Sequence, residues 1–97
     1  MLAYLYIYDC VAARESNARR VSFTKELYGF TYSWKTKSGT KTKRKVGLIE
    51  ECMGAESVTD SAILVPDGCK DQFDELFLYY RDILKIKIFK VESEVYL

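Results

Sequence analysis

Residues 2–8 alternate with a period of two. Tyr4, Tyr6 and Tyr8 share one face, and small or aliphatic residues share the other. This pattern predicts a β-strand with two apolar faces that stops at Asp9. On an open sheet face such tyrosines stack nucleic-acid bases, whereas on a covered face they pack in a core or in a dimer seam. The sequence leaves both readings open.

Two later segments are also apolar and short. Residues 61–65 predict a buried strand that ends at Pro66, the one proline of the chain. Residues 85–91 predict a last strand, which residues 95–97 extend unless they pair elsewhere.

Helical spacing marks two segments. Residues 16–28 predict a helix that Ser16 or Asn17 caps and Gly29 closes, with a partial apolar stripe from Ala18, Val21, Leu27 and Tyr28. Residues 70–84 predict a clearer helix, because apolar residues recur at helical intervals: Phe73, Leu76, Phe77, Tyr80 and Leu84. Residues 48–53 predict a helical turn closed by Gly54.

Residues 30–46 predict a β-hairpin. Aromatic and small polar residues alternate first, Ser38-Gly39 is a turn signal, and Thr then alternates with Lys. With that turn, Lys37 pairs with Thr40, Trp34 lies opposite Lys43, and Tyr32 lies opposite Lys45. One face then carries Phe30, Tyr32, Trp34, Lys43 and Lys45, and the other carries Lys35, Lys37 and Arg44.

The predicted order is β-α-β-β-(turn)-β-α-β. This is an α+β pattern close to the ferredoxin-like plan with one extra strand. We expect a single domain over residues 1–97, with a mainly antiparallel sheet and two helices on one face.

Composition narrows the class of protein. The chain has 97 residues, 48% hydrophobic and 30% charged, as in globular domains. Its apolar runs are short of the about 18–20 residues that span a bilayer, and its N-terminus lacks a signal-peptide pattern, so we expect a cytoplasmic protein without a membrane partner. Scarce Asn and Gln beside plentiful Lys and Glu are typical of thermophiles.

The three cysteines, Cys10, Cys52 and Cys69, are widely spaced, and the chain has no histidine. We therefore expect no metal site and three reduced thiols, although one pair could bridge in a thermophile.

Charge is strongly segregated along the chain. Residues 14–45 hold ten basic and two acidic side chains, whereas residues 46–97 hold five basic and eleven acidic ones. Such asymmetry is typical of proteins that bind nucleic acid or membrane surfaces. The leading hypothesis is a small RNA- or single-stranded-DNA-binding protein in which Tyr32 and Trp34 stack on bases. The phosphate contacts would come from Lys35, Lys37, Lys41, Lys43, Arg44 and Lys45, helped by Arg19 and Arg20.

Other readings of the hairpin remain open. Its aromatic residues could face the core, and its lysines could protect an edge strand from aggregation. The basic half could instead pair with the acidic half of a second copy, giving a homodimer without a ligand, or bind acidic proteins or lipids.

Catalytic motifs are scarce. Without histidine, Ser-His-Asp and Cys-His sites cannot form, and no glycine-rich phosphate loop is present. We expect no cofactor and do not expect an enzyme.

One resemblance points to an alternative. The segments Tyr6-Ile7-Tyr8-Asp9, Arg19-Arg20-Val21 and Leu27-Tyr28-Gly29-Phe30 are similar to the small CRISPR adaptation protein family, in which a first strand ending in Tyr-Asp precedes an Arg-rich helix. The resemblance covers residues 6–30 and ends at the basic hairpin. It implies a divalent-metal-dependent nuclease in which Asp9 of two copies holds the cation. Read from the residues alone, Asp9 ends a strand.

Overall fold

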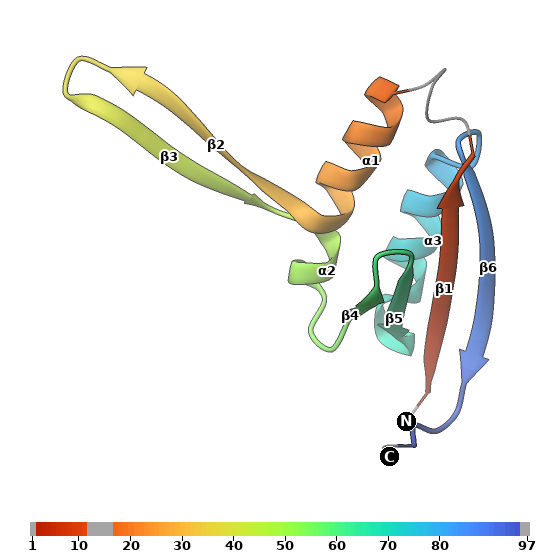
Figure 1. Cartoon of the computed structure of the whole chain (residues 1–97). Coiled ribbons are helices and arrows are strands. Elements are labelled where there is room, and N and C mark those ends of the chain that lie inside the picture. The colour runs from red at the N-terminus through yellow and green to blue at the C-terminus, as the bar shows by residue number, and fades with distance from the viewer. Residues whose placement is uncertain (1, 12–16, 96–97) are drawn as a thin grey trace.

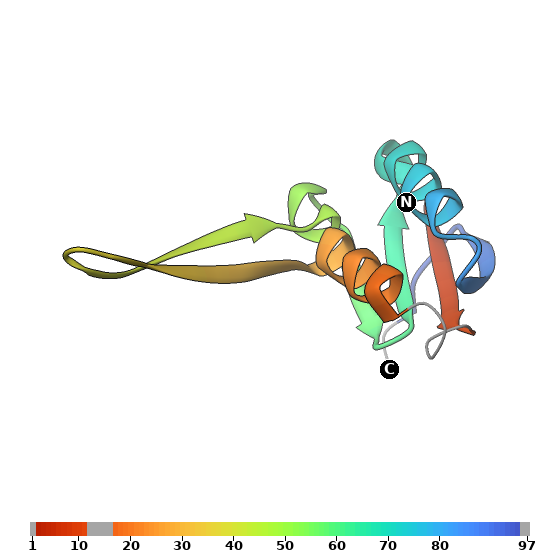
Figure 2. The same ribbon diagram turned by 90° about the horizontal axis from the view of Figure 1, so that it is seen from above.

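The computed structural model describes residues 2–11 and 17–95 (Figure 1). Its main sheet consists of β1 (Ala3–Cys10), β4 (Glu56–Thr59), β5 (Ala62–Pro66) and β6 (Leu84–Val91). The strand order is β4-β5-β1-β6, and each neighbouring pair is antiparallel. Two helices, α1 (Asn17–Tyr28) and α3 (Lys70–Tyr79), lie on one face of this sheet (Figures 1 and 2). The predicted α+β class with a mainly antiparallel sheet and two helices on one face is confirmed.

Aromatic rings fill the core between the sheet and the helices. Tyr6 and Tyr8 of β1 are buried there and contact Phe77 of α3, while Phe23 of α1 meets Tyr8 edge to face. Each phenol keeps a polar partner, as buried tyrosines need. Tyr6 donates to Asp74, and the Tyr8 and Tyr28 hydroxyls lie 2.7 Å apart. The tyrosine row is therefore a covered face, and the reading in which it stacks bases is wrong.

The basic hairpin stands apart from the main sheet. Strands β2 (Gly29–Thr36) and β3 (Gly39–Val46) pair only with each other and extend away from the helices (Figures 1 and 2). This hairpin, which we call the arm (residues 29–46), gives a molecule 54 Å long and 32 Å by 27 Å across. The expectation that its strands join a single sheet is wrong, since the arm forms a second sheet.

Two glycines form the foot of the arm. Gly29 ends α1 with φ +79°, and Gly47 leads from β3 into α2 (Leu48–Glu51). The two backbones cross so closely that a Cβ on Gly29 would lie 2.6 Å from the Gly47 nitrogen, and one on Gly47 would lie 2.6 Å from the Leu27 oxygen. Only glycine fits on either side of this crossing.

Several elements differ from the prediction. Strand β1 continues through Asp9, which pairs with Lys85, instead of stopping there. Helix α3 ends at Tyr79, short of the predicted residue 84. Leu84 fits the helical spacing but is the first residue of β6. Strand β4 was not predicted, because all four of its residues are exposed and show no apolar alternation.

The apolar stripe of α1 is also shifted. Phe23 and Leu27 are its buried residues, while Val21 is exposed. The proposed cap Ser16 and the C-terminal residues Tyr96 and Leu97 lie outside the described residues.

Two of the three cysteines form a disulfide. Cys52, directly after α2, bonds to Cys69 at the end of a 3₁₀ turn (Asp67–Cys69) that precedes α3, and their Cα atoms lie 6.4 Å apart. The expectation of three reduced thiols is wrong because the fold brings together residues that are 17 positions apart in sequence. Closing a loop of this length stabilises a fold by about 3 kcal/mol.

We expect Gly47→Ala to lower the free energy of unfolding by about 1–3 kcal/mol, because the new methyl group overlaps backbone atoms that cannot move aside. Gly47 has φ −90°, so the loss would report the crossing and not a strained dihedral. Gly68→Ala is the matched control, since nothing lies within 4 Å of its Cβ position. Urea unfolding followed by circular dichroism measures both, and equal stability of the two variants would contradict the crossing.

Candidate nucleic-acid interface

The register of the arm puts three aromatic residues opposite three lysines. Thr36 pairs with Gly39, so the turn is Lys37-Ser38 and not Ser38-Gly39. The predicted partners are therefore wrong by two residues. A shift of two keeps paired side chains on their faces, so the predicted face with Phe30, Tyr32, Trp34, Lys43 and Lys45 is confirmed. Lys37, which was predicted on the other face, lies in the turn instead. The observed pairs are Phe30–Lys45, Tyr32–Lys43 and Trp34–Lys41, and we call these six side chains the ring face.

The rings form a row along β2. The centroids of Phe30 and Tyr32 lie 5.8 Å apart, as do those of Tyr32 and Trp34, which are stacked at 28°. Tyr32 is 41% exposed and Trp34 43% exposed. The outer part of the row therefore presents aromatic surface to solvent.

The inner end of the row lies against the last turn of α1. Phe30 is half-buried, and the Lys25 ammonium lies 4.7 Å from its ring centroid. Both residues line a cleft of about 280 Å³ at the foot of the arm, together with Lys45. Lys25 was not among the predicted site residues. Its position in the last turn of the helix that Gly29 ends could have indicated that it lies near the foot of the arm.

The opposite face of the arm is polar. It carries Lys35 and Arg44, and Ser33 hydrogen-bonds across the strands to Thr42 at 3.0 Å. Lys37 lies in the turn at the tip. The predicted cations are therefore divided among two faces and a tip.

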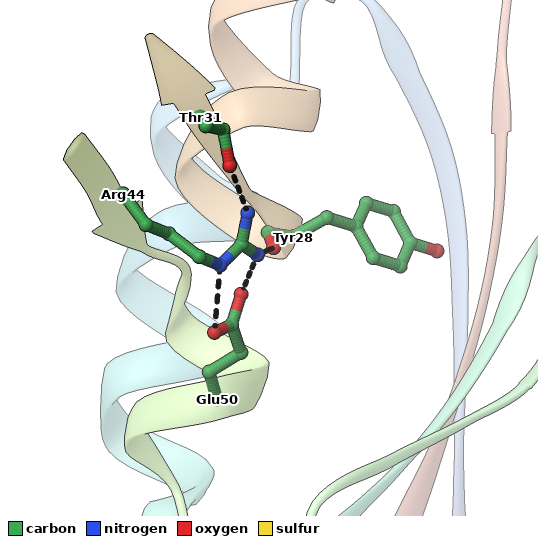
Figure 3. A network of polar contacts seen from close by, with 4 residues as sticks. All are labelled: Tyr28, Thr31, Arg44 and Glu50. Atoms are coloured by element: carbon green, nitrogen blue, oxygen red, sulfur yellow. Dashed lines mark hydrogen bonds and ion pairs between the residues drawn. The ribbon is translucent and has the colours of Figure 1, made fainter. Parts of the chain in front are cut away.

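Arg44 lies near the foot of the arm and is held there by hydrogen bonds to three neighbouring elements (Figure 3). Its guanidinium donates to both carboxylate oxygens of Glu50 in α2, to the Tyr28 carbonyl oxygen at 3.0 Å and to the Thr31 hydroxyl. The Glu50 partner raises the pKa of Arg44, and the Arg44 partner holds the pKa of Glu50 below its ordinary value. Arg44 therefore serves as a clamp that joins β3, α1 and α2.

Arg19 and Arg20 lie on α1, away from the ring face. Arg19 donates to Asp82 at 2.6 Å and 2.8 Å and to the Tyr79 carbonyl oxygen, which fastens α1 to the end of α3. Arg20 donates to Asn17 at 2.8 Å. The structure does not bring these two arginines together with the arm lysines.

The five lysines of the arm have no such role. Ion pairs among the described residues involve Arg19, Arg44 and Lys70, and none of the arm lysines takes part in them. The arm contains no acidic residue, and every residue of β3 is exposed. Within residues 2–11 and 17–95, Lys35, Lys37, Lys41, Lys43 and Lys45 therefore form no ion pair, although Lys45 shares the cleft at the foot of the arm with Glu26 and Glu51.

A second cleft adjoins the end of β1. It has a volume of about 760 Å³, and Asp9, Cys10, Arg20, Tyr28 and Asp60 are among its lining residues. Burial raises the pKa of the Cys10 thiol, which disfavours the thiolate that nucleophilic catalysis requires. In residues 2–11 and 17–95, no three Cys, Asp or Glu side chains gather as metal ligands. A metal held by Asp9 of two copies stays a prediction of the resemblance.

Comparisons with protein-family models, curated proteins and solved structures gave no match. The similarity to CRISPR adaptation proteins therefore rests on residues 6–30 alone. No helix within the described ranges is long and apolar enough to cross a membrane.

We expect Glu50→Gln to loosen the arm, because it removes the charge that holds Arg44. Since the folded-state pKa of Glu50 is lowered, the clamp contributes fully above the ordinary value of 4.5 and is lost as pH falls through the lower folded-state value. Trp34, the one tryptophan of the chain, reports arm motion through its fluorescence anisotropy. The anisotropy should fall in the variant at neutral pH, and in the wild type only on acidification.

Asp82→Asn is the control for this measurement. It breaks the Arg19 ion pair, which joins α1 to α3 and does not touch the arm. An equal anisotropy loss in both variants would show that the Arg44–Glu50 ion pair does not specifically restrict the motion of the arm.

Proposed function

We propose that this protein binds nucleic acid, RNA or single-stranded DNA, through the arm. The observation that supports this most is that Tyr32 and Trp34 of the ring face are exposed, and that its lysines form no ion pair among the described residues. A two-stranded hairpin gains little stability from exposed rings, since it has no core to bury them. Exposed aromatic rings beside unpaired ammonium groups match the two parts of a nucleotide, its base and its phosphate.

The charge of the arm selects the class of partner. Six cations within residues 29–46, with no acid among them, repel a second copy of the same arm. They attract a polyanion, whose condensed counterions are released on binding. Flexible lysines tolerate variable phosphate positions, so we propose binding that is largely independent of sequence.

We also propose that the rest of the chain is a ferredoxin-like unit. What supports this is the succession of β1, α1, β4, β5, α3 and β6, which is a β-α-β-β-α-β order once the arm and α2 are set aside. The arm is then an insertion between the first helix and the second strand of that plan.

We expect the triple variant Lys41→Ala, Lys43→Ala, Lys45→Ala to weaken binding to all sequences alike. Three lost phosphate contacts should reduce the slope of log K against log salt by about 2 for a single strand. Fluorescence polarisation with labelled single-stranded RNA and DNA at several salt concentrations measures this slope.

The matched control removes the same charge from another strand. Lys85, Lys87 and Lys90 are exposed on β6, and their triple alanine variant should keep the wild-type slope. Equal slopes in the two triple variants would remove the arm from the proposal. An absence of wild-type binding at low salt would reject nucleic acid as the partner.

A second candidate role is a homodimer, which a partly exposed apolar sheet face favours. The side of β1 turned away from the helices carries Leu5 and Ile7, and Phe89 of β6 lies beside Leu5. Ile7 is 40% exposed and Phe89 49% exposed. Packing this face against a second copy would remove apolar surface from water.

If this face forms a dimer, Phe89→Glu should give monomers, while Leu78→Glu, on the exposed side of α3, should not. Light scattering at low and high salt measures the oligomeric state. A dimer that dissociates in salt supports pairing between basic and acidic halves of two copies instead. A wild-type monomer at both salt concentrations contradicts both forms of dimer.

A further inference from the structure

We propose that the arm takes single-stranded nucleic acid by inserting bases between successive rings of the ring face. This inference rests on the proposed function and adds how the bases are held. Side chains on one face of a strand recur about every 6.8 Å along it. Stacked bases lie about 3.4 Å apart, so a base between two rings needs about 6.8 Å from ring to ring. The spacing of the strand therefore matches one inserted base per pair of rings.

The rings are close to this arrangement before any ligand binds. Both neighbouring pairs have centroids 5.8 Å apart, so each slot must widen by about 1 Å to reach the strand repeat. Tyr32 and Trp34 are exposed and lie outside the hydrophobic core, so a small side-chain rotation opens the slots without disturbing packing.

Tyr32 has a special position in this row. It forms one side of both slots, the one with Phe30 and the one with Trp34. Lys25 lies against Phe30, which limits the inner end of the row. Substitution of Tyr32 therefore removes both slots, whereas substitution of Trp34 removes the outer one.

The lysines fit the same repeat. Each ring has a lysine as its cross-strand partner, so ammonium groups recur with the period of the rings. A single-stranded nucleic acid that places one base in each slot passes its phosphates along Lys41, Lys43 and Lys45. Rings hold the bases and lysines hold the backbone, as in sequence-tolerant single-strand binding.

A duplex fits the ring face less well. A β-ribbon can enter the major groove, but base edges there present hydrogen-bonding groups. The aromatic side of the ring face has the Tyr32 hydroxyl and the Trp34 indole N–H as its only polar ring atoms. Its rings need base faces, and a duplex keeps those faces stacked on one another.

The test compares two single-stranded DNA probes with equal numbers of phosphates, oligothymidylate and an abasic strand of the same length. With the whole chain, fluorescence polarisation should show tighter binding of oligothymidylate, by about 5- to 150-fold for each inserted base. Tyr32→Ala should abolish this preference and leave affinity for the abasic strand unchanged. Trp34→Ala should reduce the preference by less. Ser33→Ala, on the opposite face, should behave as wild type.

Trp34 fluorescence gives a second readout. Oligothymidylate should quench it in the wild-type chain, and the abasic strand should not. Equal affinity for the two probes would overturn base insertion while leaving phosphate binding by the arm intact. Tighter binding of a duplex of the same length would overturn it in favour of groove binding. A lack of binding to every probe would overturn both the inference and the proposed function.

Discussion

The backbone crossing of Gly29 and Gly47 determines where the arm points. It lies where the chain leaves α1 and where it returns to α2, so both strands of the arm start from one fixed place. Two further restraints act on the same region. Arg44 ties β3 to Glu50 and to the end of α1, and the Cys52–Cys69 disulfide ties the end of α2 to the segment before α3. The foot of the arm is therefore fastened to both helices of the core.

This fastening explains how an isolated ribbon persists. A two-stranded hairpin is marginally stable in water, and the arm buries little beyond Phe30 at its foot. Cross-strand contacts such as Ser33–Thr42 add small increments along its length. A hairpin held at its foot also loses less conformational freedom on binding than a free one, which favours affinity.

The lysines of the arm can protect its edges from aggregation and also serve the proposed nucleic-acid binding. Charged residues on an exposed ribbon discourage pairing with other strands, and this accounts for Lys35 and Lys37 as well as for the ring face. Protection alone gives no reason for a row of exposed rings, since aromatic surface promotes association. The proposed nucleic-acid ligand would account for both the rings and the lysines on this face, whereas edge protection accounts for the lysines alone.

The sequence predicted periodic features well and long-range ones poorly. Period-two alternation located β1 and the arm, and the register error in the arm was harmless because it was an even number of residues. Strand β4 has no alternation to detect, and Leu84 fits both a helix and a strand. The disulfide depends on a contact between distant segments. The ring face was found because it lies within one hairpin, whereas the internal partners of Arg19 and Arg44 come from other elements.

Those partners distinguish the arginines from the lysines of the arm. Arg19 and Arg44 each bind a carboxylate with two nitrogens and also a backbone oxygen, a fixed geometry that suits the planar guanidinium. Lysine carries a compact charge on a flexible stem, which suits phosphates whose positions vary. On the arm, the arginine holds the fold, and the proposed phosphate contacts fall to the lysines. A count of positive charges along the sequence overstates the proposed binding surface, because Arg19 and Arg44 have internal partners.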